Sequence, residues 1–346
     1  MPIPNTFGLP ASADHYLVIS DEAELRRLLA EGSLSSAPLL VVGAGSNMVF
    51  ANHFSGTVIH LENKGIRLLS LTDMSTDNRQ LSITNYQLTP DDLFVEAAAG
   101  EVWDEFVQHC IDNGWHGLEN LVAIPGTVGA SPVQNVGAYG IEAKDVIHSV
   151  RAFEVATGRE RIFTNDECCF AYRDSVFKGA LKNQYIVWSV TFRLHHTFCP
   201  DLRYKALSDA LAAAAIADPT PRQLADTIAR VRWSKLPRPE ETGSAGSFFK
   251  NPVVSESHYQ DLMARYPDIV AYPVADGYKL AAGWLIEHAG WKGRSLGRCG
   301  VYERQALVLI NRGGCSGQEV VDLADAVTAD VEKLFGVILQ KEAIII

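Results

Sequence analysis

Residues 124–140, IPGTVGASPVQNVGAYG, hold four glycines in seventeen residues and few charges. A solvated loop is usually more polar, so we expect this segment to fold as a buried irregular loop. Its main-chain N–H groups then need acceptors, which the phosphates and ring carbonyls of a bound cofactor would supply. The alternative is a packed turn that satisfies its own hydrogen bonds.

A second segment of small residues, VGAGSN (42–47), ends the apolar run PLLVVG (38–43). Small side chains let main-chain N–H groups approach a pyrophosphate, and Ser46 and Asn47 add side-chain donors. The segment is not the glycine-rich turn of a Rossmann unit, because another strand (56–62) follows it rather than a helix. A tight turn between two strands is the alternative.

Apolar spacing predicts the remaining elements. The polar stretch 73–89 is typical of a long hairpin or surface excursion. Thr220, Pro221 and Gln223 predict a capped helix start, and the composition changes near 200–220, where we expect a domain boundary. We further predict strands at 93–98, 186–194, 305–311 and 337–346, a hairpin about Thr157 and Gly158, and helices at 102–113, 207–218, 279–290 and 317–336.

The composition is that of a globular protein with two or three cores: 346 residues, 47% hydrophobic and 21% charged. A formal net charge of −11 argues against nucleic acid and anionic membranes as partners. The start of the chain lacks a basic then apolar leader, and no later run reaches the roughly 20 apolar residues that span a bilayer. We therefore expect a cytoplasmic protein, and a monomer by default.

The six cysteines are scattered without a CxxC pair, which leaves no spacing for a zinc site. We expect no metal and six reduced packing residues. They are Cys110, Cys168, Cys169, Cys199, Cys299 and Cys315.

Several further motifs occur in one order along the chain. With the two glycine-rich segments, they resemble the UDP-N-acetylenolpyruvoylglucosamine reductases (UDP-N-acetylmuramate dehydrogenases) over essentially the whole chain. Departures from the family pattern occur at Ala44, Ser131 and 301–304. The motifs are NTFG (5–8), YRDSVFK (172–178), KLP (235–237), GSAGSFFKNP (243–252), KLAAGWLI (279–286), QALV (305–308) and Glu342.

This resemblance implies an α+β protein: an FAD-binding module of the vanillyl-alcohol-oxidase type, in two subdomains, and an α+β substrate-binding domain. We expect FAD-binding subdomain 1 at 1–65, joined by a C-terminal strand at 335–346. Subdomain 2 is expected at 66–215 and the substrate-binding domain at 216–334.

The resemblance also implies the reaction. NADPH reduces FAD and leaves, and UDP-N-acetylglucosamine enolpyruvate then occupies the same face and takes the hydride, which gives UDP-N-acetylmuramate for peptidoglycan. Both partners of the enzyme are small molecules. We expect FAD to be non-covalent, because neither glycine-rich segment contains a His or Cys.

Three residues are expected to be catalytic. Arg173 would offset the negative charge that hydride transfer pushes into the enolpyruvyl carboxylate, since a guanidinium stays charged and binds carboxylates through two hydrogen bonds. Protonated Glu342 would donate a hydrogen bond to the developing enediolate. Ser247 would supply the proton, with help from Lys235 or Lys250. Only four residues follow Glu342, so we expect the last strand to be weakly anchored.

By the same resemblance, substrate contacts are expected from Tyr172, Lys235, Asn251 and Gln305, and from Tyr204 as the extra substrate-closing tyrosine of one subgroup; each could instead be an ordinary hydrogen bonder. Arg232 would pair with the FAD pyrophosphate or serve the helix dipole. The other expected cofactor contacts are Gly43, Ala44, Gly45, Ser46, Asn47, Ile124, Pro125, Gly126, Gly129, Ala130, Gln134, Asn135, Gly137, Ala138 and Tyr139.

Two other classes of function remain. An oxidase on the same flavin fold would pass electrons to oxygen and would not need Ser247 together with Glu342. A non-catalytic nucleotide-binding module could lack flavin and tolerate changes at all three catalytic positions.

Overall fold

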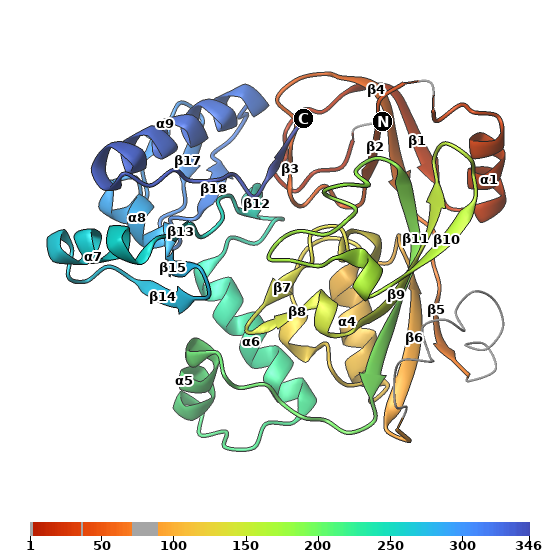
Figure 1. Ribbon diagram of the computed structural model, residues 1–346, viewed down its shortest axis with the longest axis horizontal. Helices are drawn as coiled ribbons and strands as arrows, with labels where there is room; N and C mark the ends of the chain where they lie inside the picture. The colour runs from red at the N-terminus through yellow and green to blue at the C-terminus, as the bar shows by residue number, and fades with distance from the viewer. Residues whose placement is uncertain (1–2, 36, 71–88) are drawn as a thin grey trace. The chain divides into compact units, whose positions relative to one another are not determined.

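The computed structural model describes residues 3–35, 37–70 and 89–346 (Figure 1). The chain forms two compact units, each assembled from separate stretches. The excursion predicted at 73–89 lies outside the described residues, apart from Thr89. The division into subdomains at 65, 215 and 334 stays a prediction. The first unit comprises Met1–Ser12, Gly45–Phe54 and Trp233–Ile346, and the second comprises Ala13–Ala44 and Ser55–Arg232.

A three-stranded sheet in the second unit contains the strands predicted on either side of VGAGSN. Its order is β1-β4-β2, and β2 runs parallel to β4 with Leu39 opposite Thr57. Asp21 caps the adjoining helix by accepting a hydrogen bond from Ala23 N over 3.0 Å. The elements are β1 (Ala13–Ile19), α1 (Glu22–Ala30), β2 (Leu39–Val42) and β4 (Phe54–Leu61).

The second unit also contains a five-stranded antiparallel sheet of order β10-β9-β11-β6-β5. The predicted hairpin is confirmed: Phe153 lies opposite Glu160, and Thr157 and Gly158 lie in the turn between them. The predicted strand at 186–194 is the central one. The strands are β5 (Ile66–Leu69), β6 (Asp92–Ala98), β9 (Ile147–Glu154), β10 (Glu160–Thr164) and β11 (Tyr185–His195).

Helix α4 (Trp103–Asp112) covers this sheet, and its predicted apolar face is buried. The ring of Phe106 lies 4.9 Å from that of Phe192 on β11, measured between centroids. The helix ends as predicted at Asn113, and Gly114 takes the left-handed conformation, with φ +70°.

Two helices follow the sheet. Helix α5 (Lys205–Ala213) is shorter than the predicted 207–218, because Ala215 has φ +55° and cannot continue a right-handed helix. Helix α6 (Pro221–Lys235) has the predicted start: Thr220 N donates to Gln223 Oε1 (3.0 Å), and Gln223 N donates to Thr220 Oγ1 (3.2 Å).

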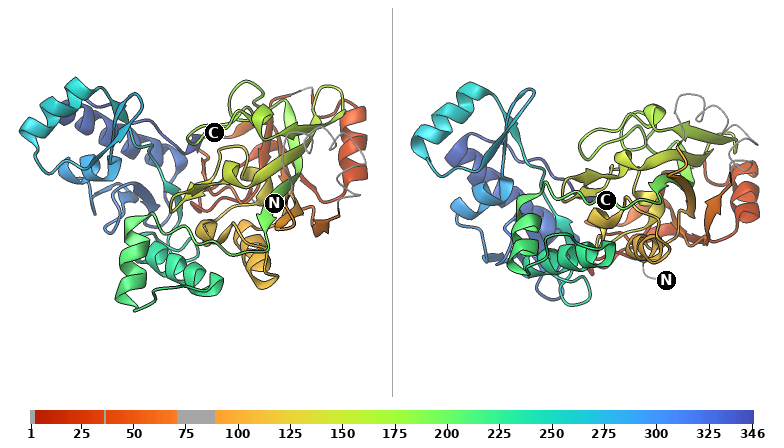
Figure 2. Two further views of the ribbon diagram at one scale, coloured as in Figure 1. Left: turned by 60° about the horizontal axis from the view of Figure 1, so that its bottom comes forward. Right: turned by 90° about the horizontal axis from the view of Figure 1, so that it is seen from below.

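The first unit is built from two small sheets, a parallel strand pair and three helices. The sheet orders are β12-β18-β17-β16 and β13-β15-β14, and β3 pairs with β19. Helix α9 lies beside β17 (Figure 1), and Figure 2 gives two further views of the chain. The elements are β3 (Met48–Val49), β12 (Ser244–Ser247), β13 (Val253–Val254), α7 (Glu256–Arg265), β14 (Ala271–Val274), β15 (Gly277–Leu280), α8 (Ala282–His288), β16 (Ser295–Leu296), β17 (Cys299–Val301), β18 (Val308–Asn311), α9 (Gly317–Phe335) and β19 (Ile344–Ile345).

Helix α9 confirms the predicted helix at 317–336. Ser316 and Glu319 form a capping box at its start, and Gly336 ends it with φ +67°. Its buried face belongs to the core of the first unit: Val320, Leu323, Ala324, Val327 and Val331.

Two predictions for the first unit need correction. Lys279 and Leu280 lie in β15, where Lys279 is opposite Val253, so the helix begins only at Ala282. Sheet pairing overrides the helical spacing there. The terminal strand predicted at 337–346 is a strand only at Ile344–Ile345, although Lys341 forms an isolated bridge with Phe249.

The end of the chain is better anchored than predicted. Ile344 N donates to Asn47 O over 2.9 Å, and Ile346 N donates to Val49 O over 2.9 Å. Ala51 N returns a hydrogen bond to Ile346 O over 2.8 Å. The last residues are therefore held as a parallel strand against β3.

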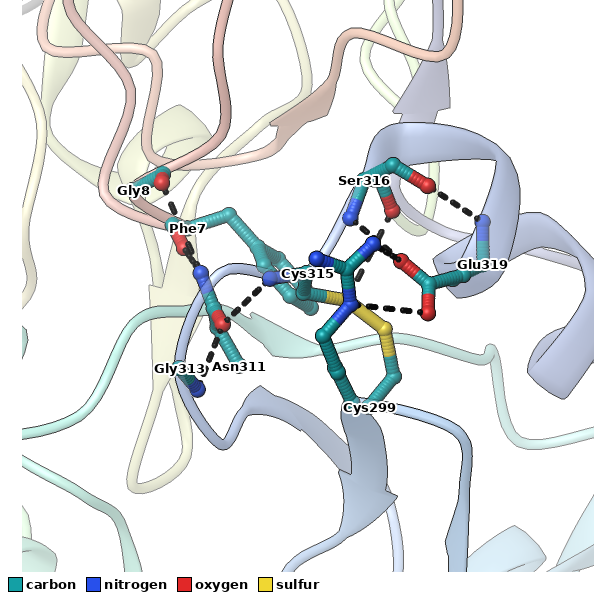
Figure 3. Close-up of a disulfide and its surroundings, with 9 residues drawn as sticks. Phe7, Gly8, Cys299, Asn311, Gly313, Cys315, Ser316 and Glu319 are labelled. Atoms are coloured by element: carbon teal, nitrogen blue, oxygen red, sulfur yellow. Dashed lines mark hydrogen bonds and ion pairs between the residues drawn. A yellow bond between two sulfur atoms is a disulfide. The ribbon is translucent and has the colours of Figure 1, made fainter.

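The expectation of six reduced cysteines is wrong at one pair, because Cys299 and Cys315 form a disulfide (Figure 3). Cys299 lies opposite Asn311 in the β17–β18 ladder, and a turn at Gly313 and Gly314 returns the chain so that the two Cα atoms lie 5.8 Å apart. Asn311 Oδ1 accepts from Gly313 N and Cys315 N and so holds this turn. Sequence spacing alone cannot show such a return. Cys169 and Cys199 are exposed, whereas Cys110 and Cys168 are buried.

Candidate active site

The glycine-rich segment 124–140 is partly fastened by the second unit itself. Val128 N donates to Glu101 O, and Gly129 N donates to Ala99 O, both over 2.9 Å. These two N–H groups are therefore already satisfied by the protein. The segment continues through the short helix η2 (Val128–Ala130) to the strand pair β7 (Gly137–Ala138) and β8 (Ile141–Glu142).

Close packing explains several of the glycines without a ligand. A Cβ built on Gly43 would lie 2.1 Å from Thr127 Oγ1, so the two glycine-rich segments touch there. A Cβ on Gly129 would lie 2.5 Å from that of Ala99. In the rest of the long segment Ile124 is buried, Ala130 is exposed, and Pro125, Gly126, Gln134, Ala138 and Tyr139 are half-buried.

The shorter segment is divided between the units: Gly43 and Ala44 belong to the second, and Gly45, Ser46 and Asn47 belong to the first. Gly45 has φ +59°, and a Cβ there would lie 2.2 Å from Pro4 O, so only glycine fits. Asn47 Nδ2 donates to Glu342 O over 3.2 Å. Within the first unit, an expected cofactor residue and an expected catalytic residue are thus in direct contact.

Arg173 lies in a tight turn in which Ala171 and Asp174 exchange main-chain hydrogen bonds of 3.0 and 3.2 Å. Its φ of +55° is left-handed, which costs about 1 kcal/mol for a residue with a Cβ. The guanidinium donates through Nη2 to Gly137 O (2.6 Å) and through Nη1 to Asn135 O (3.3 Å). It lies 5.3 Å from the centre of the Tyr172 ring. The structure therefore brings Arg173 together with three other expected site residues.

Tyr139, Tyr204 and Arg232 form a second group in the same unit. The rings of Tyr139 and Tyr204 meet edge to face, with centroids 5.1 Å apart. Burial raises the pKa of Tyr139, and the nearby charge of Arg232 opposes that rise. Burial lowers the pKa of Arg232, and the charge of Arg173 lowers it further, while Tyr139 and Asp104 act in the opposite direction.

The positive charges of Arg173 and Arg232 therefore repel each other. An anion between or beside them would relieve that repulsion. This donor set, with its small half-buried neighbours, fits a phosphate-bearing cofactor such as FAD or a substrate carboxylate.

In the first unit, Ser247 and Glu342 come from neighbouring segments. Ser247 ends β12, opposite Val308, and its chain neighbour Phe248 accepts a hydrogen bond from Glu342 N over 2.8 Å. Both side chains are half-buried. Gly246, beside Ser247, has φ +66° and open space where a Cβ would lie.

Of the expected substrate contacts in the first unit, Asn251 and Gln305 already make internal hydrogen bonds. Asn251 Oδ1 accepts from Ala282 N at the start of α8 (3.0 Å), and Gln305 Oε1 accepts from Leu307 N (3.3 Å). Lys235 is exposed at the end of α6. Lys250 N donates to Gln340 O over 2.8 Å, and Gln340 lies two residues before Glu342 in the chain.

Sequence reasoning missed two residues that support Arg173. The buried Ser175 donates through Oγ to Val133 O over 2.6 Å, and Glu142 accepts from Asn135 Nδ2 over 3.0 Å. Ser175 lies within the motif YRDSVFK, which is the signal that could have drawn attention to it. Glu142 carries no comparable sequence signal.

Among the described residues, there is no cluster of three or more His, Cys, Asp or Glu side chains able to hold a metal ion. None of the helices described between residues 3 and 346 is both long and apolar enough to cross a bilayer.

Comparison with known families gives two matches. Residues 13–164 match the family described as "FAD binding domain", and residues 238–346 match "UDP-N-acetylenolpyruvoylglucosamine reductase, C-terminal domain".

Curated relatives match almost end to end. An Azoarcus protein named UDP-N-acetylenolpyruvoylglucosamine reductase is 46% identical over 343 residues, which cover 99% of this chain and 95% of the relative. The proteins of the same name from Burkholderia vietnamiensis and Bdellovibrio bacteriovorus are 45% and 42% identical, with 98% of this chain and 93% and 96% of the relatives covered.

Among solved structures, UDP-N-acetylenolpyruvylglucosamine reductase from Thermus caldophilus superposes with a TM-score of 0.63 at 22% identity, and the alignment covers 99% of this chain and 95% of that one. This likeness and the FAD binding domain confirm the predicted fold class, an α+β protein with a flavin-binding module of the vanillyl-alcohol-oxidase type.

Proposed function

Because this chain belongs to the UDP-N-acetylenolpyruvoylglucosamine reductase family, and is therefore an FAD-dependent oxidoreductase of peptidoglycan synthesis, we propose that it reduces UDP-N-acetylglucosamine enolpyruvate to UDP-N-acetylmuramate with NADPH. The similarity over nearly the full length of both chains carries this proposal. When bound, FAD would accept a hydride from NADPH and pass it to the alkene of the substrate.

Arg173 is proposed to bind the enolpyruvyl carboxylate. Hydride arrival at the alkene pushes negative charge into a group that is already anionic, and a guanidinium offsets that charge without giving up a proton. Its two hydrogen bonds to Gly137 O and Asn135 O fix the side chain before substrate arrives, which supports this role.

Glu342 and Ser247 are proposed to handle the protons of the reaction. Glu342 would be protonated and donate a hydrogen bond to the developing enediolate, and Ser247 would protonate the carbanionic carbon. Their adjacent main chains, joined through Phe248, support a shared task. Lys235 and Lys250 remain the two candidates to assist Ser247.

The remaining assignments follow the family. Substrate would contact Tyr172, Tyr204, Lys235, Asn251 and Gln305. FAD would be held without a covalent bond by residues 43–47, by Arg232 and by residues of the segment 124–140 other than Asn135. We also propose the three-part division at residues 65, 215 and 334, a cytoplasmic location and a monomeric state.

The test is anaerobic spectroscopy of the purified holoprotein. NADPH should bleach the flavin absorbance; this step is the reductive half-reaction. UDP-N-acetylglucosamine enolpyruvate should then restore the absorbance without oxygen; this step is the oxidative half-reaction. Recovery only on admitting air would indicate an oxidase instead. Absence of flavin absorbance from protein purified with FAD would reject the assignment.

A further inference from the structure

Asn135 is fully buried, and each of its polar side-chain atoms is bound to the protein. Nδ2 donates to Glu142 Oε2 and to Ala171 O, both over 3.0 Å, and Oδ1 accepts from Lys144 N over 3.0 Å. Both amide hydrogens of the side chain are therefore used within the protein, and it has no donor left for a phosphate or a ring carbonyl of FAD.

These bonds join three pieces of the second unit. Asn135 belongs to the glycine-rich segment, Glu142 ends β8, and Ala171 opens the turn that carries Arg173. Figure 1 shows β7 and β8 side by side, and their register places Gly137 opposite Glu142.

The same residue also contacts the guanidinium, because Asn135 O accepts from Arg173 Nη1. Its side chain holds the first residue of the turn, and its main chain holds the tip of the arginine. Two further hydrogen bonds hold the turn: Ser175 Oγ donates to Val133 O, and Arg173 Nη2 donates to Gly137 O. Residues 133, 135 and 137 of the glycine-rich segment therefore each bind one part of the turn.

We propose that Asn135 is a positioning residue that sets the orientation of the Arg173 guanidinium, rather than a ligand of the cofactor. This inference rests on the proposed function, in which Arg173 binds the substrate carboxylate. It explains why the left-handed conformation of Arg173 is tolerated: the surrounding hydrogen bonds determine it. Asn135 itself has φ +46°, a conformation that asparagine accepts more readily than most residues.

Removal of the Asn135 side chain should leave a folded protein. Ala171 O keeps its hydrogen bond from Asp174 N, and Glu142 keeps its ion pair with Lys144 (2.9 Å). The main effect of the substitution should therefore be a change in the orientation of the turn that carries Arg173. Asn135→Gly is the preferred variant, since glycine accepts a positive φ without strain.

The experiment is a double-mutant cycle followed by anaerobic stopped-flow on the holoprotein. Asn135→Gly should slow the oxidative half-reaction about 10²-fold while the affinity for FAD is retained. In an Arg173→Lys background the same change should slow it by less than about threefold, because the group it positions is gone. Asn63→Gly is the matched control: Asn63 is equally a buried asparagine, bonded to Trp188 O and Gly100 N, but it does not touch the turn.

Three results would overturn the inference. FAD could be lost from Asn135→Gly while the remaining holoprotein reacts at the native rate, which would make Asn135 a cofactor ligand. The slowing could be equal in both backgrounds, or equal to that of Asn63→Gly, which would make its role only structural. If Asn135→Gly does not fold, Asn135→Asp, which keeps the size and accepts the same φ, takes its place. A native protein whose reduced flavin is not reoxidised by the substrate would instead reject the proposed function.

Discussion

Arg173 donates a hydrogen bond of 2.6 Å to the main-chain oxygen of Gly137, so a glycine of the cofactor segment directly holds the proposed catalytic cation. A Cβ at position 137 would lie 3.0 Å from Arg173 Nη1 and 2.9 Å from Glu142 Cγ. Gly137→Ala should therefore displace the guanidinium, and we expect the oxidative half-reaction to slow about 10- to 100-fold. Stopped-flow spectroscopy with UDP-N-acetylglucosamine enolpyruvate measures this rate.

The control is Gly179→Ala, since a Cβ there would meet only Ser175 O, at an ordinary 3.4 Å. Its half-reactions should match those of the native protein. A native rate in Gly137→Ala would show that the position of the guanidinium is not limiting.

Ser247→Ala should separate the two half-reactions. Without the proposed proton donor, reoxidation of the flavin by substrate should slow about 10²- to 10⁴-fold, whereas bleaching by NADPH should proceed at the native rate. Ser244→Ala on the same strand is the control for structural damage, because the hydrogen bond from Thr6 Oγ1 goes to the main-chain oxygen of Ser244, which the substitution keeps. If Ser247→Ala slowed both half-reactions equally, Ser247 would be a structural residue.

Glu342 can be tested by its hydrogen-bonding capacity. A glutamine keeps a donor where the protonated acid is proposed to donate, so Glu342→Gln should stay within about tenfold of the native oxidative rate, while Glu342→Ala should lose about 10²-fold. Equal losses in both variants would mean that Glu342 acts through its negative charge instead. The main-chain bonds of Glu342 to Phe248 and Asn47 do not depend on the side chain, so both variants should fold.

Stability in mild acid should depend on His148. This buried residue packs edge-on against Phe94, with ring centroids 4.8 Å apart, and burial, aided by the charge of Arg193, lowers its pKa from 6.5 to about 4. Between those values the unfolded chain binds a proton that the folded protein does not, so the free energy of unfolding should rise with pH by about 1.4 kcal/mol per unit.

The contribution of neutral His148 to the free energy of unfolding should be complete above pH 6.5 and should be lost as the pH falls toward 4. Urea titrations across this range should give a flatter pH dependence for His148→Phe than for the native protein. An unchanged slope in His148→Phe would contradict the assignment.

Removal of the disulfide should cost stability. Cys299 and Cys315 are 16 residues apart, and the loop they close should contribute about 3 kcal/mol to the free energy of unfolding. A reductant should lower the urea midpoint of the native protein but not that of the double variant Cys299→Ser with Cys315→Ser. An equal shift in both would mean that this disulfide contributes nothing.

Local signals in the sequence predicted local structure well. The spacing from Trp103 to Ile111, the Thr220–Gln223 cap and the alternation in β11 depend on neighbouring residues, and each produced the predicted element. The helix predicted from residue 279 is wrong at Lys279 and Leu280, because these residues pair with Tyr272 and Ala271 of β14, and Lys279 also pairs with Val253 of β13.

The parts that could not be predicted depend on how distant segments meet. The chain passes between the two units at Ser12, Ala44, Phe54 and Arg232, and no turn or composition signal marks all of these places. Asn135 could be recognised as part of a cofactor segment, but its bonds to Glu142 and Ala171 exist only in the folded protein. The pairing of Cys299 with Cys315 has the same origin.

Asn47 and Glu342 are joined although 295 residues separate them, and β19 pairs with β3 beside that contact. During translation, the residues of the second unit therefore leave the ribosome long before the partners that complete the first. Strand β3 lacks its partner until Ile344 and Ile345 are made, and contacts this distant in sequence form slowly. Ser247 and Glu342 therefore acquire their places only after the strand at Ile344–Ile345 has been made.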